Sequence, residues 1–226
     1  MSRSHDVGRL MAKMRLFGEP GWGSAIVEAQ LDWYGLAYDF ERVGDLFKSA
    51  EGFKSAEGRQ RLSAVNPLAQ IPTLVLADGT VLTESAAITL HLAELTGQDS
   101  LVPSGGDAAR LPFLRWLVFL VANVYPTYTY GDEPSRFVDG TEAAQSFRSH
   151  VDAYAKKLYS QLESVAGAPW FLGERFSALD IYVCVMTRWR PKREWFATNT
   201  PNLAAIAARA EQVPQLVACW GRNQLS

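Results

Sequence analysis

The sequence predicts an α+β domain followed by an all-α domain. Between residues 14 and 96, short β-rich segments alternate with segments of helical spacing, in a βαβ–ββα order. A stretch rich in glycine and proline, 97–107, precedes residues 108–226, where every periodic segment has helical spacing. We therefore expect a loose polar extension over 1–13, an α+β domain over 14–96, a linker over 97–107 and a helical bundle over 108–226.

The first domain begins with a strand, a helix and a second strand. A short β-rich run ends at Gly18, and a helix is predicted to begin at Ser24 and to end at Gly35, a typical C-cap residue. Residues 38–43 then alternate as a second strand. This order favours a parallel strand pair with a right-handed crossover.

The second half of this domain is predicted from its turn residues. Pro72 cannot donate to a sheet ladder, so it precedes or begins a strand. The Asp78-Gly79 turn predicts a hairpin between residues 73–76 and 81–82. The helix expected over 84–95 completes the domain.

A six-residue duplication interrupts the first domain. Phe47–Gly52 is repeated at once as Phe53–Gly58. Six residues are not a whole number of helical turns, so one helix cannot keep both phenylalanines on one face. We therefore expect a local insertion in a surface loop between Val43 and Asn66.

The second domain is expected to be helical throughout. Its predicted helices span 108–124, 141–165, 177–189, 201–211 and 214–223. Ser177 and Asp180 follow the capping-box pattern, with Asp180 in the place of the usual Glu or Gln.

The composition excludes several classes of function. With 48% hydrophobic and 20% charged residues and a formal net charge of -2, the chain has no electrostatic attraction for nucleic acid or anionic lipid. No apolar run reaches the length of a membrane span, and residues 1–13 lack the apolar core of a signal peptide, so we expect a cytoplasmic protein. Cys184 and Cys219 are expected to be buried, and no metal site is expected at His5, His91 or His150.

Two segments around the hairpin fit a zwitterionic peptide. If the Ile71–Pro72 bond is cis, the backbone N–H and C=O of Ile71 face outward, where an extended peptide can pair with them. Glu84 and Ser85 lie at a helix N-terminus, which favours an anion. Either segment alone is often only a strand start or a helix cap. Together they predict a site for a ligand with an ammonium and a carboxylate group.

Asn66–Pro72 and Thr83–Ile88 resemble the glutathione-binding half of the soluble bacterial glutathione S-transferases, and Phe171–Ile181 resembles a motif of their helical domain. The resemblance covers both halves of the chain from about Met14. It implies a thioredoxin-like first domain, a homodimer, and glutathione as co-substrate without a metal. It also implies a small hydrophobic electrophile as second substrate and a role in detoxification.

The resemblance also implies which residues bind glutathione. Glu84 and Ser85 would bind the γ-glutamyl ammonium and carboxylate, and the backbone of Ile71, before Pro72, would pair with the cysteinyl amide. Gln70 would reach a peptide carboxylate, although a solvated side chain is the alternative. Ala69 departs from the glycine that many relatives carry in this loop.

Ser24 is the residue expected to activate the thiol. The family places a Tyr, Ser or Cys after the first strand, and a hydrogen bond to a thiolate contributes about 1.5–3 kcal/mol. The alternative is a helix N-cap, because the two roles compete for one hydroxyl. Gly23 stands where other bacterial members carry a catalytic cysteine, which disfavours a thiol–disulfide oxidoreductase.

Three aromatic residues are expected to line the electrophile pocket: Trp22, Tyr125 and Tyr128. The alternatives are a core aromatic for Trp22 and a packed corner between helices for the tyrosines. The predicted function is conjugation of the glutathione thiolate to hydrophobic electrophiles. The alternative is a glutathione-binding or regulatory protein of the same fold without efficient turnover.

Overall fold

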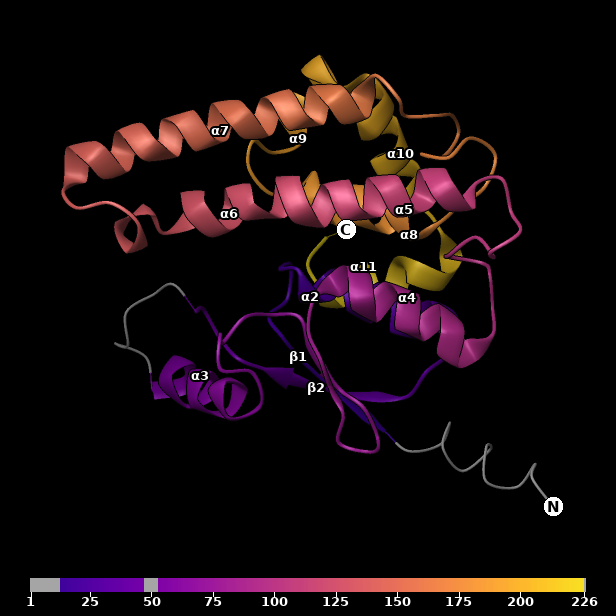
Figure 1. Ribbon diagram of the computed structural model, residues 1–226, viewed down its shortest axis with the longest axis horizontal. Helices are drawn as coiled ribbons and strands as arrows, with labels where there is room; N and C mark the ends of the chain where they lie inside the picture. The colour runs from indigo at the N-terminus through magenta and orange to yellow at the C-terminus, as the bar shows by residue number, and fades with distance from the viewer. Residues whose placement is uncertain (1–12, 47–52, 226) are drawn as a thin grey trace. The chain divides into compact units, whose positions relative to one another are not determined.

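The computed structural model describes residues 13–46 and 53–225 (Figure 1). The chain forms two compact units. One contains the described residues up to Gln98 together with those from Glu211 onward, and the other contains Asp99–Ala210. The last helical segment thus belongs to the first unit, whereas the sequence analysis assigned it to the helical domain. The reason is that this segment packs against α2 (Ser24–Tyr34) of the first unit.

The first unit is built on a mixed sheet with strand order β2-β1-β3-β4. The central strand β1 (Met14–Gly18) pairs in parallel with β2 (Tyr38–Arg42), which confirms the predicted parallel pair. On its other side, β1 pairs in antiparallel fashion with β3 (Thr73–Val75), and β3 forms the predicted hairpin with β4 (Val81–Leu82).

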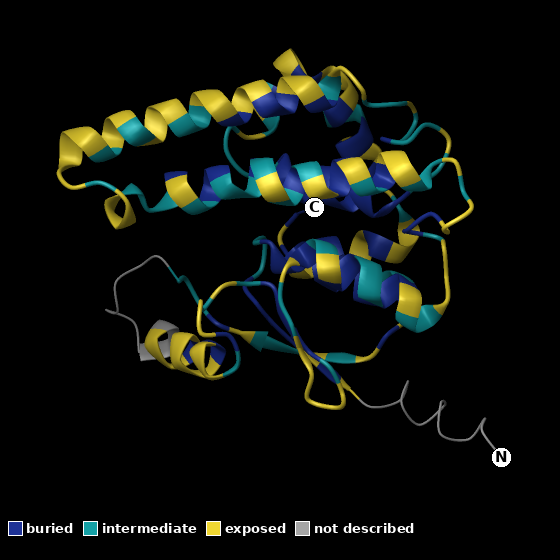
Figure 2. Ribbon diagram, in the orientation of Figure 1, coloured by how far each residue is buried: buried dark blue, intermediate teal, exposed yellow. Residues whose placement is uncertain are grey.

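Two helices of the first unit confirm the sequence analysis. The helix α2 begins at Ser24 as predicted and connects β1 to β2, and α4 (Ser85–Thr96) follows the hairpin. The two helices pack against each other, and Ile26 and Ile88 are among the residues they bury completely. Figure 2 shows buried, intermediate and exposed residues alternating along α4. The short helix α11 (Val217–Arg222) also contacts α2.

Residues from 53 onward form helix α3 (Phe53–Val65), where a loop was expected. The first copy of the duplication lies outside the described residues. Leu62 of α3 is fully buried and packs in one cluster with Phe17 and Val43. A Cβ atom on Gly58 would lie 2.1 Å from the Val43 carbonyl oxygen, so the glycine allows this close approach. The expectation of a loop was wrong for these residues. It assumed that one helix would have to contain both copies, whereas α3 begins at Phe53, the first residue of the second copy.

The second unit consists of helices. These are α5 (Arg110–Phe119), a π-helical segment (Leu120–Val124), α6 (Tyr125–Asp132), a 3₁₀ turn (Pro134–Arg136), α7 (Thr141–Glu163), α8 (Ala178–Met186), α9 (Arg193–Asn199) and α10 (Pro201–Glu211). The helix α9 was not predicted, because its seven residues are too few to show a helical period. It buries Phe196 against Tyr159, with ring centroids 4.7 Å apart.

The predicted capping box begins α8. Asp180 Oδ2 accepts a hydrogen bond from the backbone N–H of Ser177 at 2.8 Å, and Oδ1 accepts one from the N–H of Phe171 at 2.7 Å. Ser177 and Asp180 have no exposed surface. Burial raises the pKa of Asp180 to about 6, although the hydrogen bonds from these donors oppose that shift.

The burial of Asp180 predicts how stability depends on pH. Its pKa is about 6 in the folded protein and 3.8 ordinarily, so the folded state holds this proton more tightly. The free energy of unfolding of the wild type, relative to Asp180→Asn, should therefore fall as the pH rises from about 4 to about 6 and then level off. Urea unfolding at several pH values measures this difference. A flat difference for Asp180→Asn would contradict the assignment.

Candidate functional site

Three segments of the first unit meet at one end of its sheet. Because β1 and β3 are antiparallel, with Phe17 opposite Thr73, the end of β1 lies beside the residues that precede β3. Because β3 and β4 are antiparallel, with Leu74 opposite Leu82, the chain leaves β4 at the same end. The N-terminus of α2, the Ile71–Pro72 bond and the N-terminus of α4 are thereby brought together.

The Ile71–Pro72 peptide bond is cis, the condition under which the sequence analysis expected Ile71 to face a ligand. Pro72 is buried and Ile71 is half-buried. Neither backbone polar group of Ile71 makes a hydrogen bond to another residue in the described part of the chain. The backbone of Ile71 can therefore pair with an extended ligand.

Two residues that the sequence analysis did not assign to the site hold the loop before Ile71. Asn66 Nδ2 donates to the carbonyl oxygen of Gln70 at 3.1 Å and to Thr73 Oγ1 at 3.0 Å. Thr73 Oγ1 in turn donates to the same Gln70 oxygen at 2.8 Å, while the Gln70 side chain is exposed. The Asn-Pro pair at the start of the loop was the available sequence signal. Ala69 adopts a φ of 49°, so the loop forms without the glycine of many relatives.

Glu84 lies at the N-cap position of α4 in a strained conformation. Its φ is 61° and its ψ is 104°, and such a backbone costs a non-glycine residue about 1–3 kcal/mol. The Glu84 residue is exposed, and Ser85 is buried as the first residue of the helix. An exposed carboxylate thus lies next to a helix N-terminus, whose N–H groups favour an anion.

The Ser24 side chain does not cap α2, which was the alternative considered in the sequence analysis. Gly23 occupies the N-cap position and Ser24 is the first residue of α2, with no side-chain cap. Ser24 has no exposed surface, and its Oγ accepts a hydrogen bond from the N–H of Glu19 and donates one to the Glu19 carbonyl oxygen, both at 3.1 Å. The hydroxyl therefore closes the loop before α2, and this geometry favours a structural role over that of thiol donor.

Backbone N–H groups are the remaining donors at the start of α2. The N–H of Trp22 donates to the Glu19 carbonyl oxygen at 3.1 Å. Those of Gly23 and Ser24 make no hydrogen bond to any residue that the structure describes. Trp22 itself is half-buried. The start of α2 thus offers free N–H groups beside an aromatic side chain.

The carboxylate of Glu19 holds the same loop from the other side. It accepts a hydrogen bond from Arg42 Nε at 2.8 Å and one from the Gly44 N–H at 2.9 Å. Glu19 is buried, so its charge requires such partners. The loop before α2 is therefore anchored both through its backbone, at Ser24, and through this side chain.

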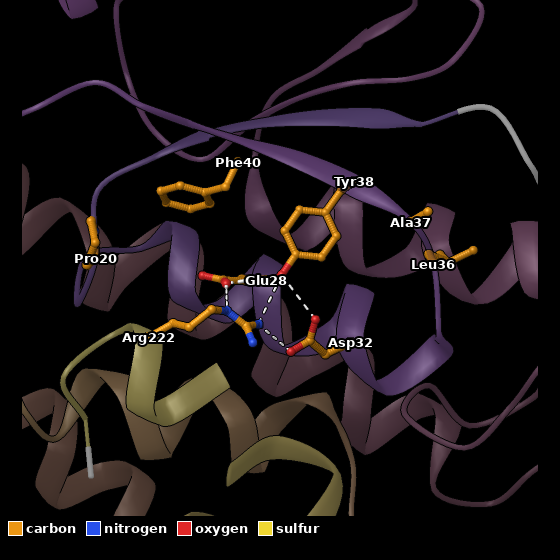
Figure 3. Close-up of a pocket in the computed structure, with 8 residues that line it drawn as sticks. All are labelled: Pro20, Glu28, Asp32, Leu36, Ala37, Tyr38, Phe40 and Arg222. Atoms are coloured by element: carbon orange, nitrogen blue, oxygen red, sulfur yellow. Dashed lines mark hydrogen bonds and ion pairs between the residues drawn. The ribbon is translucent and has the colours of Figure 1, made fainter. Parts of the chain in front are cut away.

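A pocket of about 510 Å³ lies between α2, β2 and α11 (Figure 3). It is lined by Pro20, Glu28, Asp32, Leu36, Ala37, Tyr38, Phe40 and Arg222. The Tyr38 hydroxyl lies 3.0 Å from an oxygen of Glu28 and 3.0 Å from one of Asp32. Burial and these carboxylates raise the pKa of Tyr38 well above its usual value. The residues predicted to bind glutathione do not line this pocket.

The two tyrosines predicted to line an electrophile pocket lie on α6, in the second unit. Tyr128 is buried, and its hydroxyl lies 2.6 Å from that of Tyr159 and donates to the carbonyl oxygen of Arg190 at 2.8 Å. Tyr125 is half-buried and contacts Trp189 edge to face, at 5.6 Å between centroids. Tyr128 therefore lies in a packed corner between helices, the alternative given in the sequence analysis.

Metal ligands, reactive cysteines or membrane-spanning helices among the described residues would indicate other functions. They contain no group of three or more His, Cys, Asp or Glu residues that could hold a metal ion. Cys184 and Cys219 are buried free thiols, as predicted, and burial raises the pKa of Cys219 far above neutrality. In the same part of the chain, no helix combines the length and the apolar character needed to cross a membrane.

Comparisons with known proteins agree with this architecture. The family model for the glutathione S-transferase N-terminal domain matches residues 26–95. An uncharacterized GST-like protein of Escherichia coli K12, YncG, is 38% identical over 94% of this chain and 99% of its own. A sphingomonad glutathione S-transferase, solved in complex with glutathione, is 26% identical, with a TM-score of 0.71 over 94% of this chain and all of its own.

A glutathione transferase homologue from Sulfitobacter shares the fold, with 21% identity and a TM-score of 0.76 over 92% of this chain and 97% of that one. The first unit thus has the thioredoxin-like architecture and the second the helical one of these proteins. The chain belongs to the glutathione S-transferase family.

Proposed function

We propose that this protein binds glutathione at the N-termini of α2 and α4 and transfers its thiolate to hydrophobic electrophiles. The observation that carries the proposal is the convergence of the unpaired Ile71 backbone, the strained Glu84 and the N-terminus of α2 at one end of the sheet. The sphingomonad relative, solved with glutathione, supports the choice of ligand.

In the proposed complex, the chain holds glutathione along its length. Glu84 binds the γ-glutamyl ammonium, and Ser85 with the start of α4 binds the adjacent carboxylate. The backbone of Ile71, before Pro72, pairs with the cysteinyl amide. The exposed Gln70 side chain reaches the glycyl carboxylate. Held in this way, the sulfur lies near the start of α2.

The thiolate is stabilised by hydrogen bonds at the N-terminus of α2. The free N–H groups of Gly23 and Ser24 and the helix dipole act on the sulfur there. A hydrogen bond to a charged group contributes about 1.5–3 kcal/mol, or about one to two pKa units. The Ser24 hydroxyl is the competing donor, but it would have to leave its two bonds to Glu19.

The second substrate is a hydrophobic electrophile that contacts the half-buried Trp22 at the start of α2. Tyr128 contributes to the packing behind Tyr125 instead of to the pocket surface, because it is buried. Such a reaction suits detoxification. The cytoplasm is the proposed compartment, which the free thiols of Cys184 and Cys219 support.

The alternative function is binding of glutathione without efficient turnover. The buried Ser24 hydroxyl is the observation that favours it, because a side-chain donor at the sulfur would then be lacking. Calorimetry with glutathione and a turnover assay with an aryl halide separate the two functions. Binding with turnover supports the transferase, and binding without turnover of several electrophiles supports the alternative.

Substitution of Glu84 or Ser85 should weaken glutathione binding. Glu84→Ala and Ser85→Ala each leave one charged end of the tripeptide without its partner, so calorimetry should show a loss of about 1.5–3 kcal/mol in binding free energy. Glu94→Ala, an exposed change at the other end of α4, is the matched control. Wild-type affinity in both site variants, with the fold intact, would remove this ligand assignment.

Ser24→Ala separates the two possible thiolate donors. If the backbone N–H groups hold the sulfur, the variant should lose about 1–2 kcal/mol of stability and keep the wild-type pH–rate profile. If the hydroxyl is the donor, the pKa of the bound thiol should rise by about one to two units, and turnover at neutral pH should fall about 10- to 100-fold. From the geometry of Ser24 we expect the first result.

We also propose that the protein is a homodimer. The aromatic residues Phe113 and Trp116 of α5 are buried and so cannot form the interface. Leu111 and Val118, seven residues apart on one face of α5, are 77% and 55% exposed and are the better candidates. Light scattering at micromolar concentration should give a dimeric mass, and Leu111→Glu with Val118→Glu should lower it. Val165→Glu, also at an exposed apolar residue, should leave the mass unchanged.

A further inference from the structure

The C-terminal segment after α10 contacts the loop that precedes α2. Asn223, directly after α11, accepts a hydrogen bond at its Oδ1 from the backbone N–H of Gly21, at 3.0 Å. Gly21 has a φ of 79°, and a Cβ atom there would lie 3.3 Å from the carbonyl oxygen of Asn223. The loop and the segment therefore approach each other through both a side chain and the backbone.

The other end of the Asn223 amide is bonded to α2 itself. Its Nδ2 donates to Glu28 Oε2 at 2.7 Å and to the carbonyl oxygen of Cys219 at 3.0 Å. Only 1% of Asn223 is exposed. Because one end of the amide accepts and the other donates, the side chain fits in a single orientation between the loop and the helix.

Arg222 keeps this segment in place. Its Nε donates to Glu28 Oε1 at 2.7 Å, and its guanidinium pairs with Asp32 and with the Tyr38 hydroxyl, at 3.1 Å from the latter (Figure 3). The two oxygens of Glu28 are thus shared between Arg222 and Asn223. Since Glu28 is only 3% exposed, its charge depends on these partners.

We propose that Asn223 is a positioning residue for the thiol, through the loop that Gly21 belongs to. The inference rests on the proposed function, because it concerns the N–H groups of Gly23 and Ser24. Ser24 and Glu19 anchor the start of the loop, and the Trp22 carbonyl oxygen accepts a hydrogen bond from the N–H of Ala25. The bond from Gly21 adds a link to Asn223 and, through its amide, to Glu28 of α2. Without that contact, the loop can turn its N–H groups away from the sulfur.

The test compares Asn223→Ala with Tyr38→Phe, which removes a hydroxyl bonded to the same Glu28 and Arg222 but does not contact the loop. The ultraviolet absorbance of bound glutathione, titrated with pH, reports the pKa of its thiol. In Asn223→Ala this pKa should rise by about 0.5–1 unit, and turnover at neutral pH should fall about 3- to 10-fold. The KM for glutathione should change less than about twofold, because Glu84, Ser85 and Ile71 still hold the tripeptide.

Tyr38→Phe should lower the melting temperature and leave the thiol titration at the wild-type position. A shift in Tyr38→Phe as large as in Asn223→Ala would overturn the assignment to Asn223. If Asn223→Ala does not fold, Asn223→Ser provides the same comparison, because a hydroxyl is too short to contact both Gly21 and Glu28.

Amide hydrogen exchange without glutathione distinguishes failure of this inference from failure of the proposed function. The Gly21 amide should exchange about tenfold faster in Asn223→Ala than in the wild type. Unchanged exchange would overturn the inference, whether or not glutathione binds. Faster exchange in a protein whose wild type does not bind glutathione would overturn the proposed function and, with it, the role of Asn223 toward the thiol.

Discussion

The buried carboxylate of Glu28 joins parts of the first unit that are far apart in the sequence. A charge in the interior is costly unless it is paired and hydrogen-bonded, and Glu28 obtains its partners from Tyr38 on β2 and from Arg222 and Asn223 at the C-terminus. The same side chain projects from α2, whose start is the proposed position of the sulfur. Neutralising the Glu28 charge thus holds Arg222 and Asn223 beside α2, the helix whose N-terminus is the proposed position of the sulfur.

At the proposed glutathione site, buried side chains hold the loops and mainly backbone groups are left to bind the ligand. The buried side chains of Glu19, Ser24 and Asn66 bond to the backbone of the loops, and none of the three has a polar group left for a ligand in the described contacts. The groups left for a ligand are mainly backbone ones, at Ile71 and at the helix starts. A site of this kind depends on loop conformation, and the positive φ of Glu84 shows that the chain maintains such a conformation at a cost.

The relatives show which family the chain belongs to, but the chemistry of this chain must be inferred from its own residues. YncG matches almost the entire chain and is itself uncharacterized, whereas the sphingomonad enzyme was solved with glutathione. Gly23 carries no thiol, and the Ser24 hydroxyl is buried and bonded to Glu19. In the proposed reaction the thiolate is therefore stabilised by backbone N–H groups, which cannot be identified from a sequence motif.

Local signals in the sequence determined most of the fold. The Asp78-Gly79 turn, the parallel crossover around α2 and the capping box at Ser177 were predictable because each depends on neighbouring residues. The ligand site at Ile71, Glu84 and Ser85 followed from the Ile-Pro pair and the helix start, and the family resemblance added the identity of the ligand. The buried state of Ser24, the helix in the second copy of the duplication and the contact of Asn223 with Gly21 were decided by tertiary structure. Each depends on contacts with residues that the folded chain brings close, such as Val43 for α3 and Gly21 for Asn223. The spacing of residues along the sequence does not reveal such contacts.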